Sequence, residues 1–154
     1  MKKTIENYLH LTARLNNFNS LPLFAIRAVL AYGFWGPATM KLKDIGAIAE
    51  WFSSLGIPAP HLNAWLAAGT EIAGVFLLIL GLGTRMIAIP LIITMLVAIK
   101  TVHWTNGFDA GDNGFEIPLY YIIMLLMLIV SGPGKWSLDN LIRKKCTAMC
   151  GISH

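Results

Sequence analysis

The chain has 154 residues, of which 56% are hydrophobic and only 13% are charged, and its formal net charge is +4. Soluble domains usually carry about 25% charged residues, so this composition excludes an ordinary soluble domain. Nucleic-acid binding is also disfavoured, because the basic residues flank apolar runs and form no stripe with interleaved aromatic residues. The long apolar runs instead predict an all-α membrane protein, a four-transmembrane-helix bundle that forms a single membrane domain over residues 1–154.

Residues 1–20 precede the first apolar run and lack the apolar core and cleavage site of a signal peptide. Ile5, Tyr8 and Leu15 fall near one helical face, which predicts a short amphipathic helix at the membrane surface. A polar tail that frays in water is the alternative.

The first span is predicted at about residues 21–40, where Gly36-Pro37 is expected to kink or end the helix. The connector that follows, residues 41–61, holds apolar residues at helical spacing, with Asp44 as a helix cap and Gly56 as a stop. Its helix is too short to cross a bilayer. We therefore predict a short interfacial helix between spans one and two.

Three further spans are predicted at about residues 62–82, 85–103 and 116–132. The tight turn at residues 81–85 requires the second and third spans to be antiparallel neighbours. Four spans place residues 1–20 and the tail, residues 133–154, on the same side of the membrane. That side carries eight basic residues, whereas the other carries Lys41, Lys43 and Lys100. The positive-inside rule therefore predicts that both termini are cytoplasmic. The eight are Lys2, Lys3, Arg14, Arg85, Lys135, Arg143, Lys144 and Lys145.

Glu71 lies near the middle of the second predicted span, among small residues, and Arg27 lies inside the first. An ionisable side chain at bilayer depth needs a partner, a proton or a water-filled cavity, so Glu71 is expected to face other spans. At 1.5 Å per residue the two differ in depth by about 7 Å, which an extended arginine can bridge, so an Arg27–Glu71 ion pair is expected. Three roles stay open: a lock between helices, a site for protons or a polar head group, or two unrelated residues.

Lys100, His103 and Glu116 gather at the outer ends of the third and fourth spans, beside a loop rich in Gly and Asp at residues 104–115. Histidine is the side chain best suited to exchange protons near neutral pH. The cluster has three interpretations: a solvated loop, the mouth of a ligand or proton site, or a metal site. Since no tight ligand spacing is present, no metal centre is predicted.

The tail ends with Cys146, Cys150 and His154, which a continuous helix would place on one face. Cytoplasmic thiols remain reduced, so two inert cysteines are the main interpretation. Metal binding by these three residues is the weaker alternative.

Taken together, these features resemble the DoxX family of small bacterial inner-membrane proteins. The resemblance covers about residues 20–140 and is carried by Arg27, Phe52 with Leu55-Gly56-Ile57-Pro58, Glu71-Ile72-Ala73-Gly74, Leu80-Gly81-Leu82-Gly83-Thr84-Arg85, His103, Asn113-Gly114-Phe115-Glu116-Ile117-Pro118-Leu119 and Gly132-Pro133-Gly134-Lys135-Trp136-Ser137-Leu138-Asp139. After Gly36 the chain departs from the family's Gly-x-x-Lys pattern, so no family role is carried over to Lys41.

The resemblance implies a bundle in the bacterial inner membrane that serves as an accessory subunit of a redox system linked to quinones, to thiols or sulfur, or to copper. A quinone is the cofactor that this role suggests, with Arg27, Glu71, Lys100, His103 and Glu116 as the candidates for ligand binding or proton handling. Expected partners are the lipid bilayer, further copies of the chain, and redox or biosynthetic proteins. The alternatives are a non-catalytic scaffold for soluble enzymes and a small oligomeric transporter, and whether the chain is an enzyme stays open.

Overall fold

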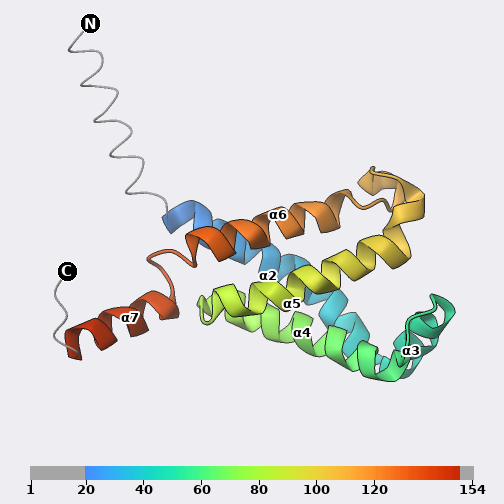
Figure 1. Ribbon diagram of the computed structural model, residues 1–154, viewed down its shortest axis with the longest axis horizontal. Coiled ribbons are helices and arrows are strands. Elements are labelled where there is room, and N and C mark those ends of the chain that lie inside the picture. Colours follow the sequence, from blue (N-terminus) through green and yellow to red (C-terminus); the bar gives the residue numbers. More distant parts are fainter. Residues whose placement is uncertain (1–19, 150–154) are drawn as a thin grey trace, which may run out of the picture.

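The computed structural model describes residues 20–149, and every regular element in this part of the chain is a helix (Figure 1). The prediction of an all-α protein is therefore confirmed for these residues. The amphipathic helix predicted before residue 20 lies outside them, as do Cys150 and His154. The elements are α2 (Ser20–Lys43), α3 (Ile45–Ser54), α4 (Pro60–Leu80), α5 (Thr84–Ala98), the short turns η1 (Ile99–His103), η2 (Trp104–Asn106) and η3 (Ala110–Asp112), α6 (Glu116–Ser131) and α7 (Leu138–Met149).

Within residues 20–149, three helical segments are long and apolar enough to cross a bilayer: α2, α4 and the run Thr84–Asn106 that begins with α5. Their bounds lie close to the predicted spans. The helix α2, however, continues through Pro37 and ends at Lys43, three residues beyond the predicted end. A fourth apolar helix, α6, has 16 residues and is about 24 Å long at 1.5 Å per residue.

The helix α3 follows α2 after a single residue, because Asp44 caps it. The Asp44 carboxylate accepts a hydrogen bond of 2.9 Å from the backbone N–H of Ala47, as the sequence predicts. Beyond α3, Gly56 adopts a positive φ of 73°, and the chain turns into α4. A helix between the first two long apolar helices is therefore present.

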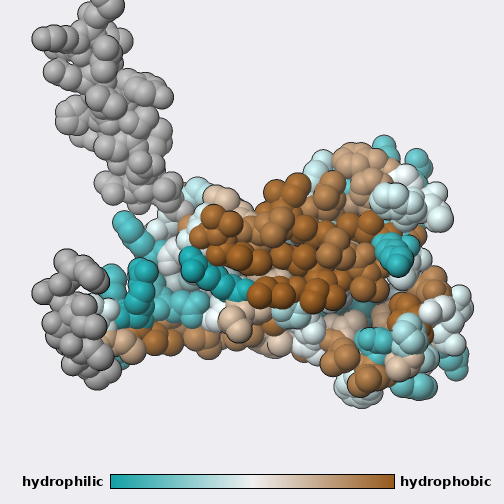
Figure 2. Space-filling view, in the orientation of Figure 1, coloured by the Kyte–Doolittle hydropathy of each residue, from teal (hydrophilic) through white to brown (hydrophobic). Residues whose placement is uncertain are grey.

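The four apolar helices run alongside one another in Figure 1, with α3 at one end and α7 at the other. The helix α2 packs mainly on α4, which packs on α5, and α5 packs on α6. Figure 2 shows a broad apolar band over the middle of the visible face, with hydrophilic residues towards both ends. Such a band between two polar ends is the surface expected of a protein that lies across a bilayer.

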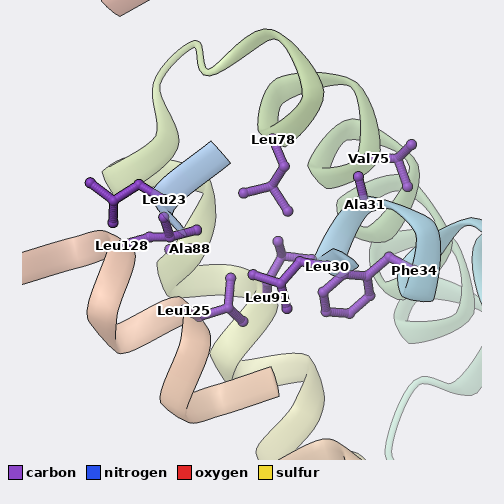
Figure 3. Packing of buried hydrophobic residues seen from close by; sticks show 10 residues of the cluster. All are labelled: Leu23, Leu30, Ala31, Phe34, Val75, Leu78, Ala88, Leu91, Leu125 and Leu128. Carbon is purple, nitrogen blue, oxygen red and sulfur yellow. The ribbon is translucent and has the colours of Figure 1, made fainter. Parts of the chain in front are cut away.

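The core is built mostly from leucines that converge from all four apolar helices (Figure 3). Leu30, Leu78, Leu91 and Leu125 are fully buried. Gly74 lets α4 and α5 approach closely, since a Cβ at this position would lie 2.9 Å from the Leu91 side chain. This is the small-residue packing that membrane helices use in place of hydrophobic collapse.

The tail predicted after residue 133 contains a helix, α7, whose first turn is attached to the bundle. The Asp139 carboxylate accepts hydrogen bonds from the backbone N–H groups of Gly83 (2.8 Å) and Thr84 (3.2 Å). These N–H groups begin α5 and have no partner within their own helix, so Asp139 acts as a cap supplied from far along the chain. The contact holds the start of α7 against the turn between α4 and α5.

That turn contains two left-handed glycines that differ in their surroundings. Gly81 has φ 64° and Gly83 has φ 56°. A Cβ at Gly81 would collide with the Arg27 guanidinium and lie 2.6 Å from the Ser137 Cβ, whereas a Cβ at Gly83 would meet nothing within 4 Å.

Replacing each glycine by alanine should therefore separate backbone strain from crowding. Gly83→Ala is expected to lower the free energy of unfolding by about 1 kcal/mol, the typical cost of a left-handed L-residue. Gly81→Ala should lower it by about 1–3 kcal/mol more, because the added methyl group overpacks a closed site. Unfolding of the purified protein by increasing SDS in mixed micelles, followed by circular dichroism, measures both. Equal losses would show that the contact with Arg27 is not tight.

Candidate functional site

Glu71 is held inside the bundle by an ion pair with Lys41. The Lys41 Nζ donates to both carboxylate oxygens of Glu71, at 2.8 Å to Oε1 and 2.6 Å to Oε2. The Glu71 side chain is 1% exposed and that of Lys41 is 12% exposed. The prediction that Glu71 faces other helices is thus confirmed, and its partner comes from the last turn of α2.

The expected Arg27–Glu71 ion pair is wrong. Arg27 is 1% exposed, and its Nη1 donates to the carbonyls of Leu78 (3.0 Å) and Ile79 (3.4 Å), while its Nη2 donates to the carbonyl of Trp136. The carbonyls of Leu78 and Ile79 lie in the last turn of α4, where the helix dipole favours a cation, and the Leu78 carbonyl also accepts a hydrogen bond of 3.2 Å from the backbone N–H of Gly81. Arg27 therefore binds the end of α4 to the segment after α6.

The Lys41–Glu71 pair lines a half-open cavity of about 1180 Å³. Residues from α2, α3, α4, α5, α6 and the turns after α5 form its wall, so every apolar helix of the bundle contributes to it. Most of the wall is apolar, and Thr70, Thr94 and Tyr121 add single polar groups. A mostly apolar cavity with a few polar groups is the usual form of a site for a small organic ligand.

The wide π turn η1 places four consecutive residues, 100–103, along the wall of this cavity. Two of the predicted site residues are among them: Lys100, which is exposed, and His103, which is half-buried. The Nδ1 of His103 lies 2.8 Å from the carbonyl oxygen of Asn113. Because a carbonyl can only accept, Nδ1 carries the hydrogen of this bond, and Nε2 remains to exchange a proton.

Glu116 is separated from this group. Its carboxylate accepts hydrogen bonds from the backbone N–H of Ala110 (3.0 Å) and from the hydroxyl of Tyr120 (2.9 Å), and it does not line the cavity. It thus fixes the loop 107–115 onto the start of α6. The predicted cluster therefore divides into two residues at the cavity and one that supports the loop.

The metal alternatives find no support in the part of the chain that the structure describes. Among residues 20–149, no three His, Cys, Asp or Glu side chains are close enough together to hold a metal ion. Cys146 is exposed on α7.

Lys41 is the functional candidate that sequence reasoning missed. It lies just beyond the predicted end of the first span and after the departure from the Gly-x-x-Lys pattern. The available signal was charge balance, since a carboxylate at the depth of Glu71 needs a cation, and Lys41 lies in the first basic cluster after the span.

Comparison with known proteins places this chain in a family. A family model described as DoxX matches residues 22–104, a range that includes Arg27, Lys41, Glu71, Lys100 and His103. It ends before α6 and α7. No solved structure gives a significant match to the chain.

Relatives extend the match to most of the chain. An uncharacterized protein of Haemophilus influenzae is 36% identical over 135 residues, which cover 82% of this chain and 86% of that protein. The inner membrane protein YphA of Escherichia coli is 32% identical over 105 residues, which cover 65% of this chain and 75% of that protein. A Bacillus subtilis protein with an oxidoreductase name, CatD, is 24% identical over 132 residues, which cover 84% of this chain and 93% of that protein.

Proposed function

The chain belongs to the DoxX family, and from this premise we propose that it is a four-span protein of the bacterial inner membrane that binds an apolar, quinone-like ligand as an accessory subunit of a redox system. The inner-membrane assignment draws on the relative YphA, and the redox assignment on the oxidoreductase name of CatD. The single observation that supports a bound ligand is the cavity that the Lys41–Glu71 pair lines.

The short helix α6 serves as the fourth span. Its inner face supplies Leu125 and Leu128 to the core, while Ile123 and Val130 on its outer face are more than half exposed. A helix that is apolar on all sides and covered on only one side needs lipid on the other. At about 24 Å it is shorter than the average hydrocarbon layer of about 30 Å, a mismatch that a bilayer accommodates by local thinning.

Four spans put the α7 end of the bundle and the start of α2 on one side of the membrane, which we assign to the cytoplasm. The basic residues at that end, among them Arg85, Lys135 and Arg143, follow the positive-inside rule. The helix α3, Lys100, His103 and the loop 107–115 then lie at the outer end, and α3 rests at the interface. The cavity opens nearer this outer end.

A quinone suits this cavity because its ring is apolar with hydrogen-bonding oxygens, and its reduction consumes protons as well as electrons. The buried pair supplies an ammonium donor, and His103 supplies a group that can exchange protons at the outer end of the site. No electron carrier is part of this proposal, so the electrons come from a partner redox protein. Arg27 is reassigned to a structural role.

The proposal predicts that the purified full-length protein carries a quinone. Extraction in mild detergent, followed by organic extraction and mass spectrometry, should give a quinone in near-stoichiometric amount. His103→Ala is expected to leave that amount unchanged and to slow ligand-linked turnover with the redox partner about 10²-fold or more, the usual loss when a proton-transfer group is removed. Phospholipid alone in the extract, from protein prepared in quinone-containing membranes, would contradict the proposal.

A second candidate, a scaffold for soluble partner enzymes, is favoured by one observation. Residues 141–147 of α7 are exposed all around, and they include the apolar Leu141 and Ile142 beside the basic residues 143–145. In Figure 1 this helix stands away from the four apolar helices. An exposed amphipathic helix of this kind is a common element of protein recognition. The extraction experiment separates the two candidates, since a scaffold requires no bound quinone.

A further inference from the structure

We infer that the Lys41–Glu71 pair makes the cavity selective for a neutral head group that accepts hydrogen bonds, such as a quinone carbonyl, and that Glu71 excludes carboxylates of the same size. Lys41 contacts the head group, and Glu71 sets the charge of the site. This inference rests on the proposed function, because it specifies the chemistry of the ligand that the cavity takes.

The first argument concerns the donors of Lys41. An ammonium group has three N–H donors. Its Nζ lies 2.8 Å and 2.6 Å from the two carboxylate oxygens of Glu71, which account for two of the three. The Glu71 side chain is 1% exposed and that of Lys41 is 12% exposed, so the lysine is the more accessible member of the pair. A ligand that reaches the pair therefore meets the lysine, whose ammonium keeps one N–H beyond the two that face Glu71, before it meets the carboxylate.

The second argument concerns charge. The ionisable side chains that line the cavity are Lys41, Glu71, Lys100, His103 and Tyr121. Lys100 is exposed to solvent, and His103 already directs Nδ1 at a backbone carbonyl. The Lys41–Glu71 pair, taken as a whole, is electrically neutral. A ligand carboxylate at Lys41 would be placed near the Glu71 carboxylate, and repulsion between like charges is strong where water is excluded.

The third argument concerns access. Six large apolar residues of the wall are between 43% and 61% exposed: Met40, Trp51, Leu66, Ile93, Val97 and Ile117. They come from α2, α3, α4, α5 and α6, so the half-open cavity is bordered by exposed apolar side chains at the flank of the bundle. In a membrane that flank faces lipid. A ligand with an apolar tail can therefore enter from the bilayer and advance its head group to Lys41.

The experiment uses the full-length protein in lipid nanodiscs with two probes that have saturated tails of similar length: decylubiquinone, a neutral dicarbonyl with a ten-carbon tail, and decanoate, a carboxylate with a nine-carbon tail. Decylubiquinone binding is followed by quenching of tryptophan fluorescence, to which Trp51 in the wall contributes. Decanoate is then tested as a competitor.

The variants are Glu71→Gln, which keeps the lysine and removes the negative charge, and the double variant Lys41→Met/Glu71→Gln, which removes both charges at similar volume. Lys43→Met, at an exposed lysine on the same helix and outside the cavity wall, is the control.

Wild-type protein is expected to bind decylubiquinone and to resist decanoate. Glu71→Gln should become sensitive to decanoate at a concentration at least tenfold lower, because Lys41 is then an uncompensated cation. The double variant should bind decylubiquinone about tenfold more weakly and again resist decanoate, and Lys43→Met should match wild type. A new preference for carboxylates is a change that loss of structure does not produce.

Three results would count against the inference in different ways. If wild type binds decylubiquinone and the double variant binds it equally well, the head group does not contact Lys41, and the cavity proposal stands without this assignment. If Glu71→Gln gains no sensitivity to decanoate, the charge argument fails. If wild type does not bind decylubiquinone at all, the proposed function itself fails. If Glu71→Gln does not fold, the double variant still tests whether the head group contacts Lys41.

Discussion

Replacing Lys41 by methionine is expected to lower the free energy of unfolding by about 3–5 kcal/mol, because it leaves the buried Glu71 carboxylate without its partner. The loss should be largely reversed in the double variant Lys41→Met/Glu71→Gln, where no buried charge remains. Replacing a buried ion pair by uncharged groups of similar volume is often close to neutral. Unfolding by SDS in mixed micelles, followed by circular dichroism, gives the four free energies of a double-mutant cycle.

The control for this cycle is Lys43→Met, two residues further along the same helix at an exposed position. It removes an equal charge without breaking a contact inside the bundle and should change the free energy of unfolding by less than about 0.5 kcal/mol. Additive losses in the cycle would show that Lys41 and Glu71 do not stabilise one another, and would contradict the geometry of the pair.

Arg27→Met is expected to lower the free energy of unfolding by about 3 kcal/mol or more, because it removes the charged donors that bind carbonyls at the end of α4 and after α6. Arg27→Lys should recover only part of this loss. An ammonium keeps the charge but lacks the planar fork that lets one guanidinium serve carbonyls on two segments. The same SDS unfolding experiment measures both variants.

Arg85→Met is the matched control for Arg27. Arg85 is also an arginine near the turn between α4 and α5, but it is exposed and donates a single hydrogen bond of 3.2 Å to the carbonyl of Val130. Its loss should lower the free energy of unfolding by about 1 kcal/mol or less. Equal free energies of unfolding for Arg27→Met and Arg85→Met would contradict the role of Arg27 in binding the end of α4 to the segment after α6.

The helices and the inward position of Glu71 could be predicted from the sequence because both depend on local composition. A run of about 20 apolar residues defines a span, and a carboxylate among small residues in that run must turn away from lipid. The cap by Asp44 and the turn at residues 81–83 were predictable for the same reason, since caps and turns are set by the residues that form them.

The partner of Glu71 could not be predicted in this way. Depth along two helices placed Arg27 within reach, but whether two side chains meet also depends on the rotation and tilt of each helix, which no local pattern records. The continuation of α2 through Pro37 brought Lys41 into contact instead. Arg27 instead donates to carbonyls in the last turn of α4. Any cation near the C-terminal end of a helix can bind such carbonyls, so the sequence alone does not select between this contact and an ion pair with Glu71.

The cap of α5 by Asp139 has a consequence for how the protein is made. Ribosomes deliver the chain from its first residue to its last, so α2, α4 and α5 are synthesised before the segment that closes their ends. Until that segment emerges, the first N–H groups of α5 lack Asp139, and the guanidinium of Arg27 lacks the carbonyl of Trp136. The contacts that close the bundle can therefore form only after residues 136–139 have been synthesised, and chains cut short within α6 would leave both of these polar groups without their partners.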